Sequence, residues 1–300
     1  MMTDLARPGG HRLSPALLLA VVLMAAAATS SKAAETVNVL YAGSLVNLME
    51  HDMGPAFEAA TGQKFRGYAG GSSLLANQIK GKLRQGDIFI SASSKVNSTL
   101  MGSTNGSWVS WYVVFGESAL MIGYSTSSRF AADFKSKPWY EVLAEPGIRI
   151  GRTDPNLDPK GALTLKLLAA AEQFYHRPGL ARQVLGADEN PAQVLPEETL
   201  VGRMQSGQLD AGFFYSTEIN DARIPSASLP AAIAPKAVYT VTILRDAPHA
   251  SGAQRFVAFL LGGQGRRILA RHGVTLVKPT VSGAANHAPP AIRALATGNQ

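Results

Sequence analysis

The sequence predicts an α/β fold with mostly parallel strands, because short β-like runs alternate with helical stretches along the chain. The clearest example is a β-α-β-α-β run near the amino end. Its strands are predicted at Val37–Tyr41, Phe65–Tyr68 and Asp87–Ser91, each a short run rich in apolar residues. After Ser44 and after Ser72, apolar residues recur at helical spacing, which predicts two helices that cover the sheet.

The same alternation continues beyond residue 110. Further strands are predicted at Trp111–Phe115, Ala119–Tyr124, 147–151, Asp210–Tyr215 and Ala237–Leu244. Further helices are predicted at Pro159–Tyr175, Glu197–Gln205, Ala253–Leu260 and Gly265–His272. From Val281 the chain is rich in Ala, Pro and Gly, and we expect a flexible tail.

Residues 1–33 have the pattern of a cleavable signal peptide. Arg7 and Arg12 give a basic start, and Leu17–Ala28 forms an apolar core of twelve residues. This core is shorter than the roughly 20 residues that a membrane-spanning helix needs. Ser31–Ala33 fits the small-x-small pattern of a signal peptidase site. We therefore expect export to the periplasm, with a membrane anchor as the alternative.

The composition limits the function classes. The chain has no cysteine, which excludes disulfides and a lipid-modified cysteine. Removal of residues 1–33 takes away three Lys/Arg and one Asp, and lowers the formal charge from +7 to +5. This mild excess suits an anionic ligand, although scattered surface lysines and arginines give the same number. No dense basic run is interleaved with aromatic residues, so we expect no nucleic-acid partner. The remaining length of about 267 residues is enough for two domains.

The usual catalytic motifs are absent from the sequence. Gly70–Leu74 lacks the final glycine of a G-x-S-x-G nucleophile turn, and there is no P-loop and no complete G-x-G-x-x-G. The histidines are isolated and form no H-E-x-x-H. We therefore expect a binding protein without enzymatic activity or cofactor. A secreted hydrolase that uses Ser44 or Ser72 is the alternative from another class.

Two segments share the order strand, small residues, serine, helix: Tyr41–Leu45 and Ala69–Leu74. A serine in the first turn of a helix presents its hydroxyl beside unpaired backbone N–H groups, and glycine allows a ligand to approach the backbone. Two such helix starts at the carboxyl ends of adjacent parallel strands converge on one crevice. The pair predicts a small-anion site. The alternative is that each serine only caps its helix.

Six motifs in this order resemble the periplasmic molybdate/tungstate-binding proteins of ABC importers: YAGSL, GGSSLLANQI, DIFISAS, WYVVFGESALMIGY, DPNLDPKG and LDAGFFYSTE. The resemblance extends from about Val37 to Val277. It implies the two-lobed, Venus-flytrap fold of type II periplasmic binding proteins, with the oxyanion in the cleft. We expect residues 36–116 plus 236–280 to form lobe 1, residues 117–235 to form lobe 2, and residues 281–300 to form the tail.

The resemblance also implies which residues bind the ligand: Ser44, Ser72 and its neighbour Ser73 in the first lobe, and Thr153, Thr199 and Tyr215 in the second. It further implies a small oxyanion ligand and an ABC permease in the inner membrane as partners. We expect the protein to be a monomer. Sulfate, phosphate or an organic acid remains the alternative ligand.

Some relatives extend the metal to six-coordination with an aspartate and a glutamate. The aspartate matches Asp158, whereas Phe214 stands where the glutamate is expected, so tetrahedral recognition is favoured. Asp158 also directly precedes Pro159, a pattern typical of a helix N-cap followed by proline at the first helical position. Its two interpretations are metal ligand and cap. We expect Glu218 and Asp221 to be solvated, because a carboxylate would repel a dianion.

Overall fold

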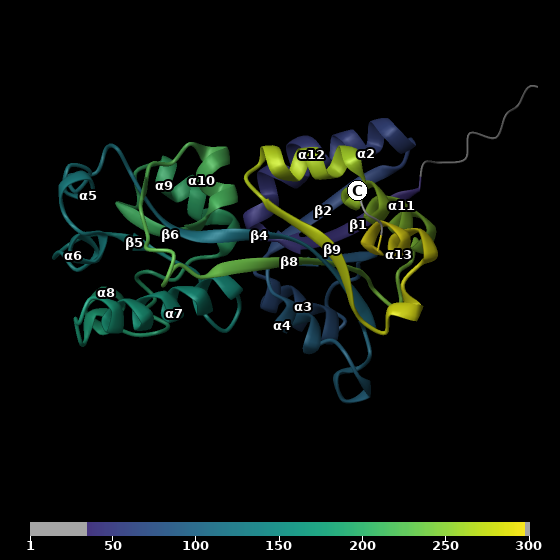
Figure 1. The fold of residues 1–300 in the computed structure, drawn as a ribbon, viewed down its shortest axis with the longest axis horizontal. Helices are drawn as coiled ribbons and strands as arrows, with labels where there is room; N and C mark the ends of the chain where they lie inside the picture. Colours follow the sequence, from purple (N-terminus) through teal and green to yellow (C-terminus); the bar gives the residue numbers. More distant parts are fainter. Residues whose placement is uncertain (1–34, 298–300) are drawn as a thin grey trace, which may run out of the picture. The chain divides into compact units, whose positions relative to one another are not determined.

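A mixed β-sheet organises the chain (Figure 1). The computed structural model describes residues 35–297, and the predicted signal peptide lies outside them. The strand order is β2-β1-β3-β8-β4-β6-β5, with β7 and β9 also paired to β4. These strands are Thr36–Ala42 (β1), Lys64–Gly70 (β2), Ile88–Ser91 (β3), Trp111–Tyr124 (β4), Ile150–Gly151 (β5), Ala211–Tyr215 (β6), Ser226–Ala227 (β7), Lys236–Ile243 (β8) and Thr275–Gly283 (β9).

The prediction of mostly parallel strands is wrong. Strand β1 is parallel to β2 and β3, and β5 is parallel to β6, but the pairs made by β4 and β8 are antiparallel. The reason lies in the connectivity. Strand β4 carries the chain from one half of the sheet to the other and β8 brings it back, so two neighbouring crossing strands must run in opposite directions.

Strand β4 is one continuous element where the sequence predicts two strands. Its first part pairs with β8 and β9, and Leu120–Tyr124 pairs with β6. The register shifts between Val114 and Gly116, which marks an irregularity of the bulge type. The sequence predicts a break at residues 116–118, but Gly116, Glu117 and Ser118 pair with β8 and continue the strand.

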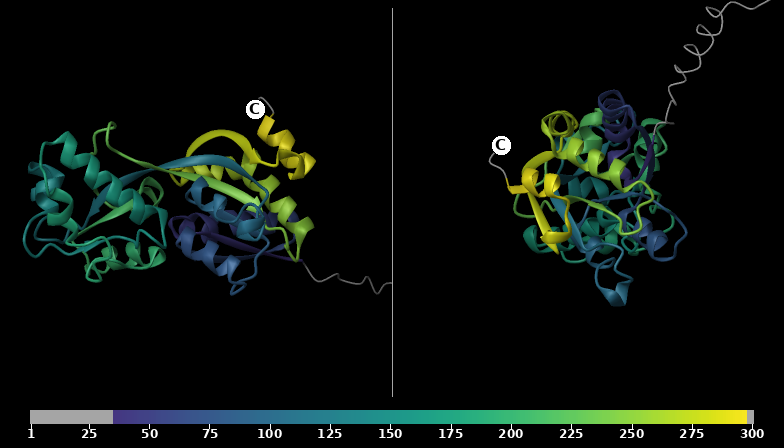
Figure 2. Two further views of the ribbon diagram at one scale, coloured as in Figure 1. Left: turned by 90° about the horizontal axis from the view of Figure 1, so that it is seen from below. Right: turned by 90° about the vertical axis from the view of Figure 1, so that its right-hand side faces the viewer.

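Figures 1 and 2 show two groups of elements joined by β4 and β8, and these form a two-lobed α/β fold. The first lobe contains β1, β2, β3, β9 and the paired parts of β4 and β8. The second lobe contains β5, β6, β7 and the end of β4. The expected lobe bounds fall inside β4, at residues 116/117, and at the first residue of β8, Lys236.

In the first lobe, helices cover both faces of the sheet (Figure 1). Val37, Val39 and Tyr41 of β1 belong to one apolar core with α2, α11 and α12, whereas Leu40 packs in a second core with α3 and α4. This alternation is what a strand buried on both faces requires. The helices of this lobe are η1 (Gly43–Leu45), η2 (Leu48–Met53), α2 (Gly54–Thr61), α3 (Ser72–Lys80), α4 (Ser94–Ser98), η3 (Ser103–Asn105), α11 (Ala250–Leu261), α12 (Gly263–Arg271), η5 (Ala285–His287) and α13 (Pro290–Thr297).

The second lobe is built in the same way around β5 and β6. Its longest helix, α7 (Pro159–Phe174), begins directly after the DPNLDP motif. The other helices are α5 (Asp133–Ser136), α6 (Trp139–Leu143), α8 (Leu180–Leu185), η4 (Glu197–Thr199), α9 (Leu200–Gln205) and α10 (Ser216–Ala222). Within residues 35–297, no helix combines the length and the apolar character needed to cross a bilayer.

The carboxyl-terminal segment differs from the expected flexible tail over its described part. Strand β9 continues to Gly283 and helix α13 covers Pro290–Thr297. Ile292 and Ala296 of this helix are buried, and α13 packs against β9 and α11. The Ala-, Pro- and Gly-rich composition was the basis for expecting a flexible tail. The spacing of Ile292 and Ala296, four residues apart, places both on one helical face and explains why the segment folds onto the first lobe.

Candidate functional site

The two predicted serine loops lie side by side at the carboxyl ends of β1 and β2. Ser44 stands in η1, and Ser72 is the first residue of α3. Both side chains are buried. The Ser44 hydroxyl lies 3.1 Å from the hydroxyl of Tyr239, and the Ser72 oxygen accepts a hydrogen bond of 3.1 Å from the backbone N–H of Ala92. Neither side chain caps a helix, so the alternative that these serines are only N-caps is wrong.

The second lobe approaches these loops closely. The backbone N–H of Leu74 donates to the carbonyl oxygen of Leu157 over 2.9 Å, which ties the start of α3 to the loop before α7. A methyl group added at Gly71 would lie 2.6 Å from that same carbonyl oxygen. A methyl group at Gly43 would lie 2.9 Å from a carboxylate oxygen of Glu197. The absence of side chains at these two glycines therefore allows the lobes to meet here.

Asp158 joins the second lobe's side of the junction as the N-cap of α7. Its Oδ1 accepts hydrogen bonds from the backbone N–H of Lys160 at 3.0 Å and from the hydroxyl of Thr153 at 2.8 Å. An N-cap of this kind contributes about 1 kcal/mol to stability. The other oxygen, Oδ2, is buried and has no hydrogen-bond partner within residues 35–297. Asp158 is therefore a cap that keeps one acceptor free.

Tyr215 ends β6 at the same junction. Its backbone N–H donates to Glu218 Oε2 over 2.7 Å, which closes the first turn of α10. Its hydroxyl is fully buried and has no partner in the described part of the chain. Burial, and then the negative charges of Asp158 and Glu197, raise the pKa of the Tyr215 hydroxyl well above its ordinary value. The hydroxyl therefore stays protonated and is a free donor.

A buried lysine, Lys160, and two buried glutamates, Glu197 and Glu218, lie near Asp158 and Tyr215, and these five residues form a buried cluster. The lysine and the two glutamates were not predicted as site residues. The Nζ of Lys160 is inaccessible to solvent, lies 2.8 Å from Glu218 Oε1 and 3.3 Å from Glu197 Oε1, and stands 5.1 Å from the ring centre of Tyr215. The expectation that Glu218 is solvated is wrong, because its side chain is 5% exposed and paired with Lys160. The same expectation is wrong for Asp221, because its side chain is 10% exposed and its Oδ1 lies 2.7 Å from His272 Nδ1.

The position of Lys160 in the sequence gave one indication that it has acidic partners. Lys160 lies in the first turn of α7, where the helix dipole disfavours a cation. A lysine at such a position needs nearby carboxylates to compensate, and the structure supplies them from α10 and η4. Glu197 carried no comparable signal, because nothing in its sequence neighbourhood indicates burial.

The cluster changes the proton affinities of its members. Burial alone would lower the pKa of Lys160, but Glu218, Glu197 and Asp158 together raise it. Burial raises the pKa of Glu197 well above its usual range, with Asp158 adding to the effect and Lys160 opposing it. Burial also raises the pKa of Glu218, against the opposing effect of Lys160. A carboxyl group whose pKa is raised in the folded state binds protons more strongly there than in the unfolded state. These two glutamates therefore make the free energy of unfolding fall as the pH rises above the ordinary pKa of a glutamate.

The other predicted site residues are placed differently. Thr153 is buried and orients Asp158, whereas Thr199 is half-buried and donates to the carbonyl oxygen of Pro196 over 2.9 Å. Ser73 is half-buried in the first turn of α3. Phe214 packs in an apolar core with Leu200, Met204, Leu209, Ile219 and Ile224, as strand alternation places it on the face of β6 opposite to Tyr215.

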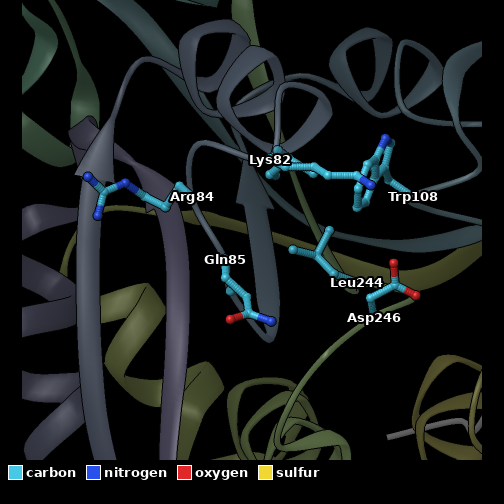
Figure 3. A pocket seen from close by; sticks show the side chains of 8 residues that line it. Lys82, Arg84, Gln85, Trp108, Leu244 and Asp246 are labelled. Carbon is cyan, nitrogen blue, oxygen red and sulfur yellow. The ribbon is translucent and has the colours of Figure 1, made fainter.

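The cluster borders a pocket of about 260 Å³. Its walls come from both lobes: Ser44 and Gly43 on one side, and Glu197, Glu198 and Glu218 on the other. A separate pocket of about 310 Å³ lies in the first lobe at the amino end of β3, away from the end where Ala92 meets Ser72. Figure 3 shows the side chains that line it, Lys82, Arg84, Gln85, Trp108, Leu244 and Asp246. None of the predicted ligand-binding residues borders this second pocket.

Two α/β lobes that are joined by crossing strands and meet over buried polar groups define a two-lobed binding protein. The chain belongs to the bacterial extracellular solute-binding protein family, whose model matches residues 37–275. The family predicted from the six sequence motifs is thereby confirmed as a solute-binding family.

The chain is also similar to a curated relative and, in its fold, to solved structures. The molybdate/tungstate-binding protein WtpA of Thermococcus kodakarensis is 26% identical over 334 aligned positions, which cover 92% of this chain and 94% of that protein. The solved periplasmic molybdate-binding protein of Azotobacter vinelandii has a TM-score of 0.61 at 19% identity, covering 80% of this chain and 99% of that one. The sulfate-binding protein SubI of Mycobacterium tuberculosis has a TM-score of 0.57 at 14% identity, covering 87% and 90%. These structures share the two-lobed fold.

Proposed function

We propose that this protein captures molybdate or tungstate in the periplasm and delivers it, as a monomer, to an ABC permease in the inner membrane. The observation that carries the proposal is the Tyr215 hydroxyl, a buried donor without a partner at the junction of the two lobes. A buried polar group without a partner is costly, so an unpaired donor in such a place suits a ligand that accepts hydrogen bonds. The similarity to WtpA over almost the whole chain favours the same ligand class.

The proposed ligand lies between the loops of the first lobe and the capped start of α7. Ser44 and Ser72 then contribute hydroxyls from the first lobe, and Tyr215 contributes its hydroxyl from the second. Binding by groups from both lobes stabilises the closed form relative to the open one, because only the closed form makes all contacts at once. Phe214 faces an apolar core, so a carboxylate at that position is not available and tetrahedral recognition is favoured.

Phosphate is a second candidate for the ligand, because the cluster contains hydrogen-bond acceptors without a partner. A protonated oxyanion needs an acceptor as well as donors, and the cluster holds free acceptors in Asp158 Oδ2 and the oxygens of Glu197. A serine hydrolase has weaker support. The partners of Ser44 and Ser72 are the hydroxyl of Tyr239 and the N–H of Ala92, and neither group is a general base.

Calorimetric titration of the purified mature protein with molybdate, tungstate, sulfate and phosphate tests the proposal. Molybdate and tungstate are almost equal in size, and we expect them to bind with affinities that differ little. Sulfate is smaller and cannot reach donors on both lobes at once. Two unpaired donors at about 1–3 kcal/mol each give at least a roughly thirty-fold weaker affinity. Sulfate or phosphate binding as tightly as molybdate would remove the assignment to metal oxyanions but leave the solute-binding class intact.

A further inference from the structure

The charge balance of the cluster is unusual for an anion site. Three carboxylate side chains, Asp158, Glu197 and Glu218, are buried around one ammonium group, Lys160. A bound dianion would add two negative charges to this enclosed site. Uncompensated charges in a protein interior cost several kcal/mol each, so a further positive charge must enter with the ligand.

The three carboxylates differ in how they are held. Glu218 accepts hydrogen bonds from Lys160 Nζ at 2.8 Å and from the Tyr215 N–H at 2.7 Å, and Asp158 Oδ1 accepts from Lys160 N and Thr153. Glu218 thus has a donor for each of its oxygens, and Asp158 has two donors for Oδ1. Both oxygens of Glu197 are buried without a hydrogen-bond partner in the described residues, and its nearest cation, Lys160 Nζ, lies at 3.3 Å. Glu197 is therefore the member best suited to hold a proton.

We propose that the oxyanion binds together with one proton, which Glu197 holds and donates in a hydrogen bond to the bound anion. The inference rests on the proposed function. In the step itself, water or buffer gives up a proton, a new O–H bond forms on the Glu197 carboxylate, and no other covalent bond changes. Once protonated, the Glu197 carboxyl no longer repels the anion but donates a hydrogen bond to it, as the Tyr215 hydroxyl does.

Closure of the lobes couples the binding of the anion to the uptake of the proton by Glu197. Glu197 belongs to η4 of the second lobe, and the first lobe covers it at Gly43, where the backbone approaches its carboxylate closely. The groups that act on Glu197 are Lys160 of α7, Glu218 of α10, Asp158 before α7, Tyr215 of β6 and Tyr239 of β8. When the lobes are apart, Glu197 faces water and ionises in the ordinary way. When they close, burial raises its pKa, and a proton enters.

The pocket of about 260 Å³ gives this proton a route. Glu197, Glu198 and Ser44 line it, and Glu198 is exposed to solvent. The route is also short, because Glu197 and Glu198 are adjacent in η4. Exchange with solvent therefore needs no chain of buried carriers.

The first experiment is calorimetry of the wild-type protein with molybdate near pH 7, in two buffers that differ in ionisation enthalpy. The difference in binding enthalpy counts the protons taken up, and we expect about one per bound anion. The affinity for molybdate is then expected to fall about tenfold for each unit of pH increase. Hydrogen phosphate carries its own proton, so its binding is expected to take up fewer protons from the buffer.

Glu197→Gln localises the proton, with Glu141→Gln as the control, since Glu141 is a glutamate of the second lobe with an exposed side chain that lines neither the pocket nor the cluster. Glutamine has the same shape and cannot ionise, so Glu197→Gln is expected to abolish proton uptake and to flatten the pH dependence, whereas Glu141→Gln keeps both. Molybdate binding by the wild type without proton uptake overturns this inference and leaves the proposed function standing. Proton uptake that persists in Glu197→Gln overturns the role of Glu197. Failure of every oxyanion to bind overturns the proposed function as well. If Glu197→Gln does not fold, the wild-type proton count still decides whether a proton binds with the anion.

Discussion

Replacement of Lys160 by methionine is expected to lower the free energy of unfolding by about 3–5 kcal/mol at neutral pH, because it leaves buried carboxylates without their cation. Lys160 is completely buried and bridges Glu218 and Glu197. Methionine fills a similar volume, so the loss comes from charge and not from a cavity. Urea unfolding followed by circular dichroism measures it. The loss is expected to shrink toward acidic pH, where the glutamates, whose pKa values are raised, take up protons and need no partner.

Lys166→Met is the matched control, since Lys166 lies on the same helix and is exposed. We expect this change to stay within about 0.5 kcal/mol of the wild type. In the double variant Lys160→Met/Glu218→Gln, part of the lost stability is expected to return, because one of the two uncompensated charges is removed. Equal free energies of unfolding for the Lys160 and Lys166 variants would show that the ion pairs of Lys160 with Glu218 and Glu197 do not stabilise the folded protein.

Tyr215→Phe is expected to weaken oxyanion binding by roughly ten- to a hundred-fold, because a hydrogen bond to a charged group is worth about 1.5–3 kcal/mol. The change removes only the hydroxyl, which has no partner in residues 35–297. The ring keeps its edge-on contact with Tyr239, whose centre lies 6.4 Å away. The free energy of unfolding is therefore expected to stay equal or to rise. Calorimetry and urea unfolding of the same preparation measure both quantities.

Tyr124→Phe provides the comparison for Tyr215→Phe. Tyr124 is also a buried tyrosine of the second lobe, at the end of β4, and it stacks on Phe134 with ring centres 4.7 Å apart. It lies outside the cluster, so its replacement should leave the affinity for molybdate unchanged. A Tyr215→Phe variant that binds as tightly as Tyr124→Phe would exclude the Tyr215 hydroxyl as a ligand donor.

The sequence predicts local features well because they depend on neighbouring residues. The first three strands, the start of α3 at Ser72 and the cap of α7 at Asp158 all follow from short patterns and are confirmed. The α/β class was predicted from the alternation of strand and helix runs, and the two-lobed fold from six motifs in a fixed order. The structure confirms both. The direction of the crossing strands was not predictable from such patterns, since it depends on how the chain returns from the second lobe.

The buried cluster shows the same limit more clearly. Lys160, Glu197 and Glu218 come from α7, η4 and α10, and only the folded chain brings them together. Taken singly, each charged residue is expected on the surface, because charged residues are rarely buried without a partner. The interpretation of Glu218 as solvated rested on the repulsion between a carboxylate and a dianion, and it failed because Lys160 compensates the charge of Glu218. The predictions for Ser44 and Ser72 rest on local strand-to-helix turns, and that for Tyr215 rests on the family resemblance. The structure places all three residues at the junction of the lobes.

X-ray diffraction from crystals grown with molybdate, recorded at the absorption edge of molybdenum, locates the metal directly. We expect one anomalous peak between the lobes, with its oxygens within hydrogen-bond distance of the hydroxyls of Ser44, Ser72 and Tyr215 and of the Glu197 carboxyl. The metal is expected to keep four oxygens, with Asp158 remaining the cap of α7. A peak elsewhere on the protein, or a six-coordinate metal that takes Asp158 as a ligand, would contradict this account of the site.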